Sequence, residues 1–163
     1  MYAAAAAAAV AIIIILKPGA EKIESNEQLY ARYARPEELP AVVRGANDDS
    51  LLVKATVLYN QAKYAAALLL LDSITRQKPL EAQLQLAMGI CFLETGIPDS
   101  AIRRFDSLAE RESVYKYDAV EWKGLSYLKL NKTADCIAAL KLIPQDASNY
   151  TKAKELMEKL LKK

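Results

Sequence analysis

The sequence predicts an all-α protein built from about three helical hairpins, with a capping helix after them and an apolar helix before them. The composition favours helix, because 163 residues include only five glycines and six prolines. Small and large apolar residues recur at intervals of about 34 residues from residue 48 onward. Residues 2–16 carry no charge. We therefore expect an apolar helix over 1–17, a linker with a short helix over 18–47, and a repeat domain over 48–163.

The N-terminal apolar run predicts a membrane span. Residues 2–16 consist of alanines, a valine, a leucine, isoleucines and one tyrosine, and Lys17, Pro18 and Gly19 end the run. As a helix these residues reach about 22 Å, which is less than the roughly 30 Å hydrocarbon core of a bilayer. We therefore expect Met1 not to be the natural start and upstream residues to complete the span. One alternative is a secretory signal peptide, although this sequence lacks the basic start and the small-residue cleavage site that a signal peptide has. The other alternative is a buried helix of a soluble core.

The repeat emerges when three segments are aligned on their small residues. Ala55, Gly89 and Gly124 fall into one register, 34 and 35 residues apart. Four further columns keep these intervals and their chemical type: Leu58, Phe92 and Tyr127; Ala67, Ala101 and Cys136; Leu71, Phe105 and Leu140; Ile74, Leu108 and Ile143. Such a period is typical of a helix-turn-helix repeat. The units are about 48–81, 82–115 and 117–147, followed by a capping helix over 148–162.

Small residues are needed where the two helices of a hairpin cross closely, and larger residues then fill the space beside them. Gly96 and Asn131 suit the left-handed conformation that ends a first helix, and Pro98 suits the start of the next helix. The last helix carries one apolar stripe, as expected of a terminal cap: Tyr150, Ala153, Leu156, Met157, Leu160 and Leu161.

Residues 48–161 resemble the tetratricopeptide repeat (TPR) family. The likeness is carried by Tyr64-Ala65-Ala66-Ala67 with Pro79, by Gly89, Gly96, Ala101 and Phe105, and by Trp122-Lys123-Gly124-Leu125-Ser126-Tyr127. Departures are Ala55 and Ala62 in place of frequent glycines, Pro98 in place of an aromatic residue, and Cys136 in place of alanine. The resemblance implies a right-handed superhelical array of hairpins that binds another protein.

More narrowly, the chain resembles membrane-anchored TPR proteins of Bacteroidetes-type bacteria. The likeness lies in the order of a single span, the linker Leu29-Tyr30-Ala31-Arg32-Tyr33, the repeats, and a closing helix with Tyr150, Ala153 and Leu156. It implies a periplasmic repeat domain. The basic residues that follow the apolar run instead favour the cytoplasm by the positive-inside rule, so both orientations stay open.

No catalytic, metal or cofactor motif is present in the sequence. It has no histidine, which removes most triads and zinc sites. Cys91 and Cys136 lie in apolar helical patterns and are interpreted as small buried residues. A net charge of +2, with 22 basic and 20 acidic residues interspersed, gives no basic face for nucleic acid. We expect neither an enzyme nor a cofactor-binding or small-molecule-binding protein.

The predicted site is the concave groove lined by the first helix of each hairpin. Its partner-binding residues are expected to be Leu52, Thr56, Tyr59, Asn60, Leu86, Ile90, Leu93, Leu125 and Leu128. Either an apolar peptide or helix of a partner fills this groove, or the chain's own residues 28–43 do. The sequence thus predicts a membrane-anchored TPR protein that mediates protein–protein interaction or complex assembly. The alternative is a structural accessory subunit of a larger membrane complex, with its groove permanently filled.

Overall fold

The computed structural model describes residues 23–40, 50–76 and 81–162, and the expected membrane span over 1–17 lies outside them. These residues form helices and no strand, which confirms the all-α prediction for this part of the chain. The helices are α1 (Asn26–Tyr33), α2 (Ser50–Asn60), α3 (Tyr64–Thr75), α4 (Ala82–Glu94), α5 (Pro98–Ala109), α6 (Lys116–Lys129), α7 (Thr133–Leu140) and α8 (Tyr150–Leu161).

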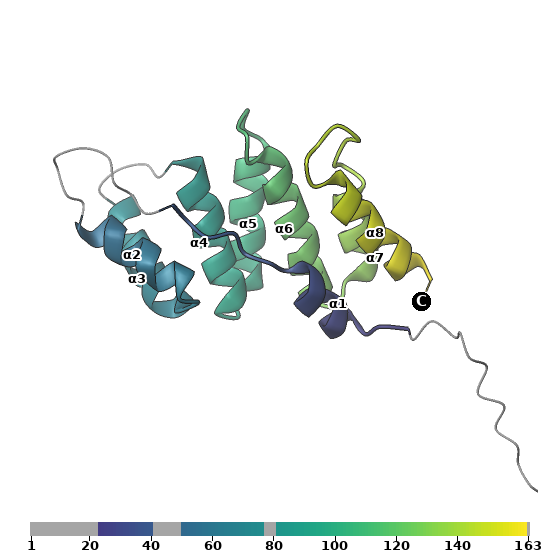
Figure 1. Ribbon diagram of the computed structural model, residues 1–163, viewed down its shortest axis with the longest axis horizontal. Helices are drawn as coiled ribbons and strands as arrows, with labels where there is room; N and C mark the ends of the chain where they lie inside the picture. The colour runs from purple at the N-terminus through teal and green to yellow at the C-terminus, as the bar shows by residue number, and fades with distance from the viewer. Residues whose placement is uncertain (1–22, 41–49, 77–80, 163) are drawn as a thin grey trace, which may run out of the picture.

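Six of these helices form three stacked hairpins. The pairs are α2 with α3, α4 with α5, and α6 with α7, and each second helix also packs on the next first helix. The hairpins follow one another along the long axis of the molecule, and α8 packs against α7 at the far end (Figure 1). This is a helical-repeat arrangement in which each unit buries its apolar face against its neighbours.

The turn inside each hairpin uses one residue in the left-handed conformation. Ala62, Gly96 and Asn131 have φ angles of 55°, 81° and 59°. In each case the next residue donates its backbone N–H to a carbonyl at 2.8–2.9 Å, five positions back: Lys63 to Leu58, Ile97 to Phe92, and Lys132 to Tyr127. This pattern is the Schellman C-cap. The prediction for Gly96 and Asn131 is confirmed, and Ala62 holds the same position in spite of its side chain.

The predicted close crossings lie inside the hairpins. A Cβ atom built on Gly89 would overlap the Phe105 ring of α5, and one built on Gly124 would come within 3.0 Å of Leu140 Cδ2 on α7. The equivalent small residue of the first hairpin, Ala55, is fully buried. The repeat register read from the sequence therefore corresponds to real contacts between paired helices.

The segment before the hairpins has its own structure. Ser25 begins α1 with a capping box, in which its hydroxyl accepts from the Gln28 amide and its own amide donates to the Gln28 side chain. After α1 the chain continues without regular structure to Pro40. We call residues 23–40 the arm. Figure 1 shows α1 in front of α6, and the rest of the arm running across the stack toward α2.

Candidate functional site

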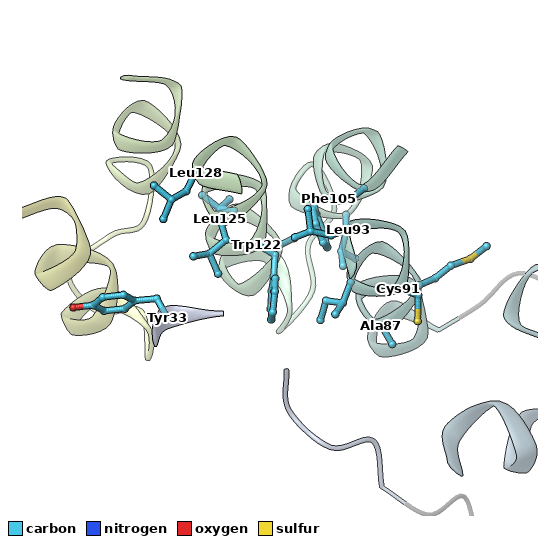
Figure 2. Close-up of a cluster of buried hydrophobic side chains, with 14 of the residues drawn as sticks. Tyr33, Ala87, Cys91, Leu93, Phe105, Trp122, Leu125 and Leu128 are labelled. Carbon is cyan, nitrogen blue, oxygen red and sulfur yellow. The ribbon is translucent and has the colours of Figure 1, made fainter. Parts of the chain in front are cut away.

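The predicted groove residues lie on α2, α4 and α6, but the protein itself covers most of them. Six of the nine are buried: Thr56, Tyr59, Ile90, Leu93, Leu125 and Leu128. Leu52 and Leu86 are partly buried, and Asn60 is exposed. The continuous core that includes the labelled leucines and Trp122 of Figure 2 contains the buried apolar members of this set, and Leu52 and Leu86 pack against it. The set is therefore a packed surface rather than an open apolar groove.

The arm provides much of this cover. Leu29, Tyr33 and Leu39 are all buried in the same core, and α1 packs on α6 and α8. Leu29 and Tyr33 are four residues apart, so they lie on one face of α1. Burying three large side chains of this kind stabilises a segment by several kcal/mol, at about 1.5–3 kcal/mol each before the entropy cost. The described part of the predicted covering segment, residues 28–43, thus packs on the hairpins.

Asn60 fixes the extended half of the arm. Its side-chain carbonyl accepts from the Leu39 amide at 2.9 Å, and its side-chain N–H donates to the Leu39 carbonyl at 2.9 Å. A single amide thereby satisfies both backbone groups of one arm residue, as a neighbouring β-strand would. Asn60 was predicted to contact a partner, and in the structure it contacts this chain.

Tyr30 fixes the helical half of the arm. Its hydroxyl donates to Glu94 Oε1, and the Lys129 ammonium lies 3.3 Å from Glu94 Oε2 and 4.7 Å from the centre of the Tyr30 ring. Lys129 also donates to the Leu93 carbonyl at 3.1 Å. Burial and then the Glu94 carboxylate raise the pKa of Tyr30, so its hydroxyl stays protonated and remains a donor. This cluster joins α1 to both α4 and α6.

The start of the arm is joined to the turn between α6 and α7 and to α8, at the end of the array opposite the first hairpin. Asn26 donates to Asn131 Oδ1 at 3.1 Å and to Thr133 Oγ1 at 3.2 Å. Glu24 lies 2.7 Å from Arg32 and 3.5 Å from Lys159 of α8. The arm is thus attached along its whole described length.

A small open cleft remains beside the extended half of the arm. It has a volume of about 60 Å³. Its polar lining includes Arg35, Glu37, Tyr115, Asp118, Glu121 and Lys152, and its apolar lining includes Leu39, Leu86 and Ile90. The cleft is smaller than the few hundred Å³ of a typical ligand pocket.

The carboxylate of Glu121 is buried at this cleft but fully engaged. It lies 2.6 Å from Lys152 Nζ and accepts from Asn149 Nδ2 at 2.9 Å. Burial, and then Glu121 and Glu37, raise the pKa of Asp118, while Lys152 opposes this shift. The Glu121 carboxylate is thereby satisfied, as is usual for a buried carboxylate, whereas Asn149 Oδ1 is buried without a hydrogen-bond partner among the described residues. Lys152 and Asn149 were not among the predicted site residues, because nothing in the sequence pairs them with a residue about 30 positions away.

Neither a metal-binding cluster nor a candidate membrane-spanning helix is found among residues 23–40, 50–76 and 81–162. Among these residues no group of three or more Asp, Glu, Cys or His side chains is placed to hold a metal ion. No helix within the described ranges is long and apolar enough to cross a membrane.

No protein family, no curated protein and no solved structure matches this chain.

Proposed function

We propose that this chain is a membrane-anchored, TPR-like scaffold whose concave face is filled by its own arm, and that it serves in the assembly of a membrane-associated complex. The stacked hairpins, the repeat period of 34–35 residues and the shared left-handed turn support the TPR-like assignment. No catalytic or cofactor role is proposed, because the buried carboxylate beside the arm, Glu121, is engaged by Lys152 and Asn149.

The observation that carries this proposal is the contact of the arm with α2, α4 and α6, the helices that carry the predicted groove residues. An open groove that takes partner peptides would leave Ile90, Leu93, Leu125 and Leu128 accessible, and all four are buried. The arm also holds its place through directional polar contacts at Asn60 and at Glu94. This favours the structural-subunit hypothesis, with a permanently filled groove, over a free peptide-binding groove.

The arm also defines how the array would sit at a membrane. Between the expected span over 2–16 and the first described residue, Ile23, lie six residues, 17–22. Fully extended, six residues reach no more than about 20 Å. Because the start of the arm is bound to Asn131, Thr133 and Lys159, the end of the array formed by α7 and α8 is proposed to lie next to the membrane. The periplasm is the proposed compartment, and the cytoplasm is the alternative.

Cutting the chain between the arm and α2 tests the filled groove. A protease site placed within residues 44–47 allows the full chain, purified in mild detergent, to be cleaved after folding. We expect the arm to stay with the hairpins through gel filtration, and the double variant Asn60→Ala, Tyr30→Phe to release it. Release of the arm from the unsubstituted protein would contradict a permanent filling and would favour exchange with a partner.

Membrane attachment is tested separately. The full chain should sediment with membranes and require detergent for extraction, whereas a chain that begins at residue 23 should stay in the aqueous fraction. An intact chain that stays in the aqueous fraction would refute the anchor and would leave the filled groove unaffected.

A further inference from the structure

One side of α2 carries apolar side chains that no described helix covers. Val53 and Val57 lie one helical turn apart and are 40% and 47% exposed. Lys54, beside them, is also exposed. The first hairpin forms one end of the array (Figure 1). We call Val53, Lys54 and Val57 the α2 end face.

The repeat register shows what this side of a first helix does in the other two hairpins. Adding the intervals of 34 and 35 residues takes Val53 to Ala87 and Trp122, Lys54 to Met88 and Lys123, and Val57 to Cys91 and Ser126. The equivalents of the two valines are almost inaccessible: Ala87 2%, Cys91 0%, Trp122 6% and Ser126 0% exposed. Figure 2 shows Ala87 and Cys91 on one side of α4, and Trp122 between α6 and the α4–α5 hairpin. In α4 and α6 this side is an interface.

The second helix of the preceding hairpin contacts this side at Trp122, Lys123 and Met88, whereas Ala87 lines the cleft beside Leu39 and Tyr59. Trp122 stacks on Phe105 of α5, with ring centres 6.5 Å apart. Lys123 Nζ lies 2.5 Å from Asp106 Oδ1, also on α5. Met88 accepts a weak hydrogen bond from Thr75 of α3 at 3.8 Å. Met88 and Lys123, the residues equivalent to Lys54, thus each face a polar or acidic side chain of the preceding helix.

We propose that the α2 end face docks an amphipathic helix of a partner protein, in the place that α5 takes against α6. The docked helix would present a large apolar residue over Val53 and Val57, followed by an aspartate or glutamate that pairs with Lys54, as Phe105 and Asp106 do in α5. The scaffold would in this way be extended by one helix of its partner. Docking at this face does not depend on the membrane anchor or on the filled groove.

Charge complementarity favours a partner over a symmetric second copy. Two α2 end faces brought together would offer two lysines and no carboxylate, and like charges in contact oppose docking. A head-to-tail contact with a second copy would set α8, with its exposed Glu155, Glu158 and Leu161, against α2. Such a head-to-tail contact would repeat from copy to copy as a ring or a filament, and sedimentation would detect it.

The test uses the α5 helix of this chain as the probe. A synthetic peptide of residues 98–111 is stapled between positions 103 and 107, which are exposed and one turn apart. Its binding to the full chain in mild detergent is measured by fluorescence anisotropy. We expect saturable binding that Val57→Asp weakens at least about tenfold, because a carboxylate would be buried against apolar residues. Val114→Asp, at an exposed valine on the loop between α5 and α6, is the matched control and should bind as the unsubstituted chain does.

A charge exchange makes the test specific for Lys54. Lys54→Glu should weaken binding roughly two- to fivefold, as expected for a partly exposed ion pair, and Asp106→Lys in the peptide should restore it. The proposal is overturned if no saturable binding occurs at millimolar peptide, or if Val57→Asp and Val114→Asp behave alike. It is also overturned if the chain self-associates in sedimentation and Val57→Asp abolishes this, or if the peptide binds only after residues 1–22 are removed. Those two results would assign the face to a second copy or to the chain's own N-terminus.

Discussion

Gly89 on α4 faces the ring of Phe105 on α5 so closely that a single added methyl group would overlap it. This contact sets the distance between the two helices of the second hairpin. In the third hairpin the corresponding pair, Gly124 and Leu140, is looser, with 3.0 Å from a built Cβ to the leucine.

Gly89→Ala should destabilise the protein by about 1–2 kcal/mol. Overpacking costs roughly 1–3 kcal/mol, and the better helix propensity of alanine recovers up to about 1 kcal/mol. Gly124→Ala should be close to neutral, because a leucine side chain can shift by a few tenths of an ångström. Urea unfolding followed by circular dichroism measures both. Equal losses in the two variants would show that the crossing at Phe105 is not the tighter one.

Ala62→Gly should stabilise the protein by about 1 kcal/mol. Ala62 has a φ angle of 55°, a conformation that costs a residue with a Cβ roughly 1–2 kcal/mol and costs glycine little. Ala138→Gly, at an exposed position inside α7, is the control and should destabilise by about 1 kcal/mol. Denaturant midpoints that fall in both variants would refute a left-handed Ala62.

Cys91 and Cys136 should not react with an aromatic disulfide reagent at pH 8 while the protein is folded. Both thiols are buried, and burial raises the pKa of each to about 12. Very little thiolate is then present at pH 8, and the thiolate is the nucleophile. Both should react at once after unfolding in guanidinium. Rapid reaction of either thiol in the native protein would show that its helix face is open.

Tyr30→Phe tests the contact between the arm and Glu94 through its pH dependence. Burial and Glu94 raise the pKa of Tyr30 above its ordinary 10.0. Above pH 10 the unfolded chain therefore loses this proton while the folded protein keeps it, and the stabilising contribution of Tyr30 falls as the pH rises. We expect the variant to be about 1–3 kcal/mol less stable at pH 7. Its deficit relative to the unsubstituted protein should shrink between pH 10 and 11. A deficit that is constant from pH 7 to 11 would contradict the buried hydrogen bond.

Periodicity predicted the parts of the fold that depend on apolar spacing. The crossing residues Gly89 and Gly124, and the turns at Gly96 and Asn131, were all visible because glycine, asparagine and small side chains mark backbone requirements directly. Ala62 was noted only as a departure from a frequent glycine. Its left-handed turn follows from the repeat register and not from its own residue type.

The polar contacts of the candidate site could not be predicted in the same way. Asn60 bonds to the backbone of Leu39, and Glu121 to Lys152 and Asn149, across separations of 21 to 31 residues. Such contacts depend on the final orientation of side chains and leave no period in the sequence. The sequence did place apolar residues in the arm, including Leu29, Tyr33 and Leu39, and their apolar character was the signal that this segment packs on the hairpins.

Hydrogen exchange at the Leu39 amide is the most direct test of the proposal that the arm fills the groove. This N–H donates to Asn60 Oδ1 in a segment without regular structure, so its protection depends on docking of the arm. In the full chain we expect exchange at pH 7 to be slowed at least about a hundredfold relative to an unstructured peptide, and Asn60→Ala to restore fast exchange. Exchange of the Leu39 amide at the unstructured rate in the unsubstituted protein would contradict the account, because the groove would then be open.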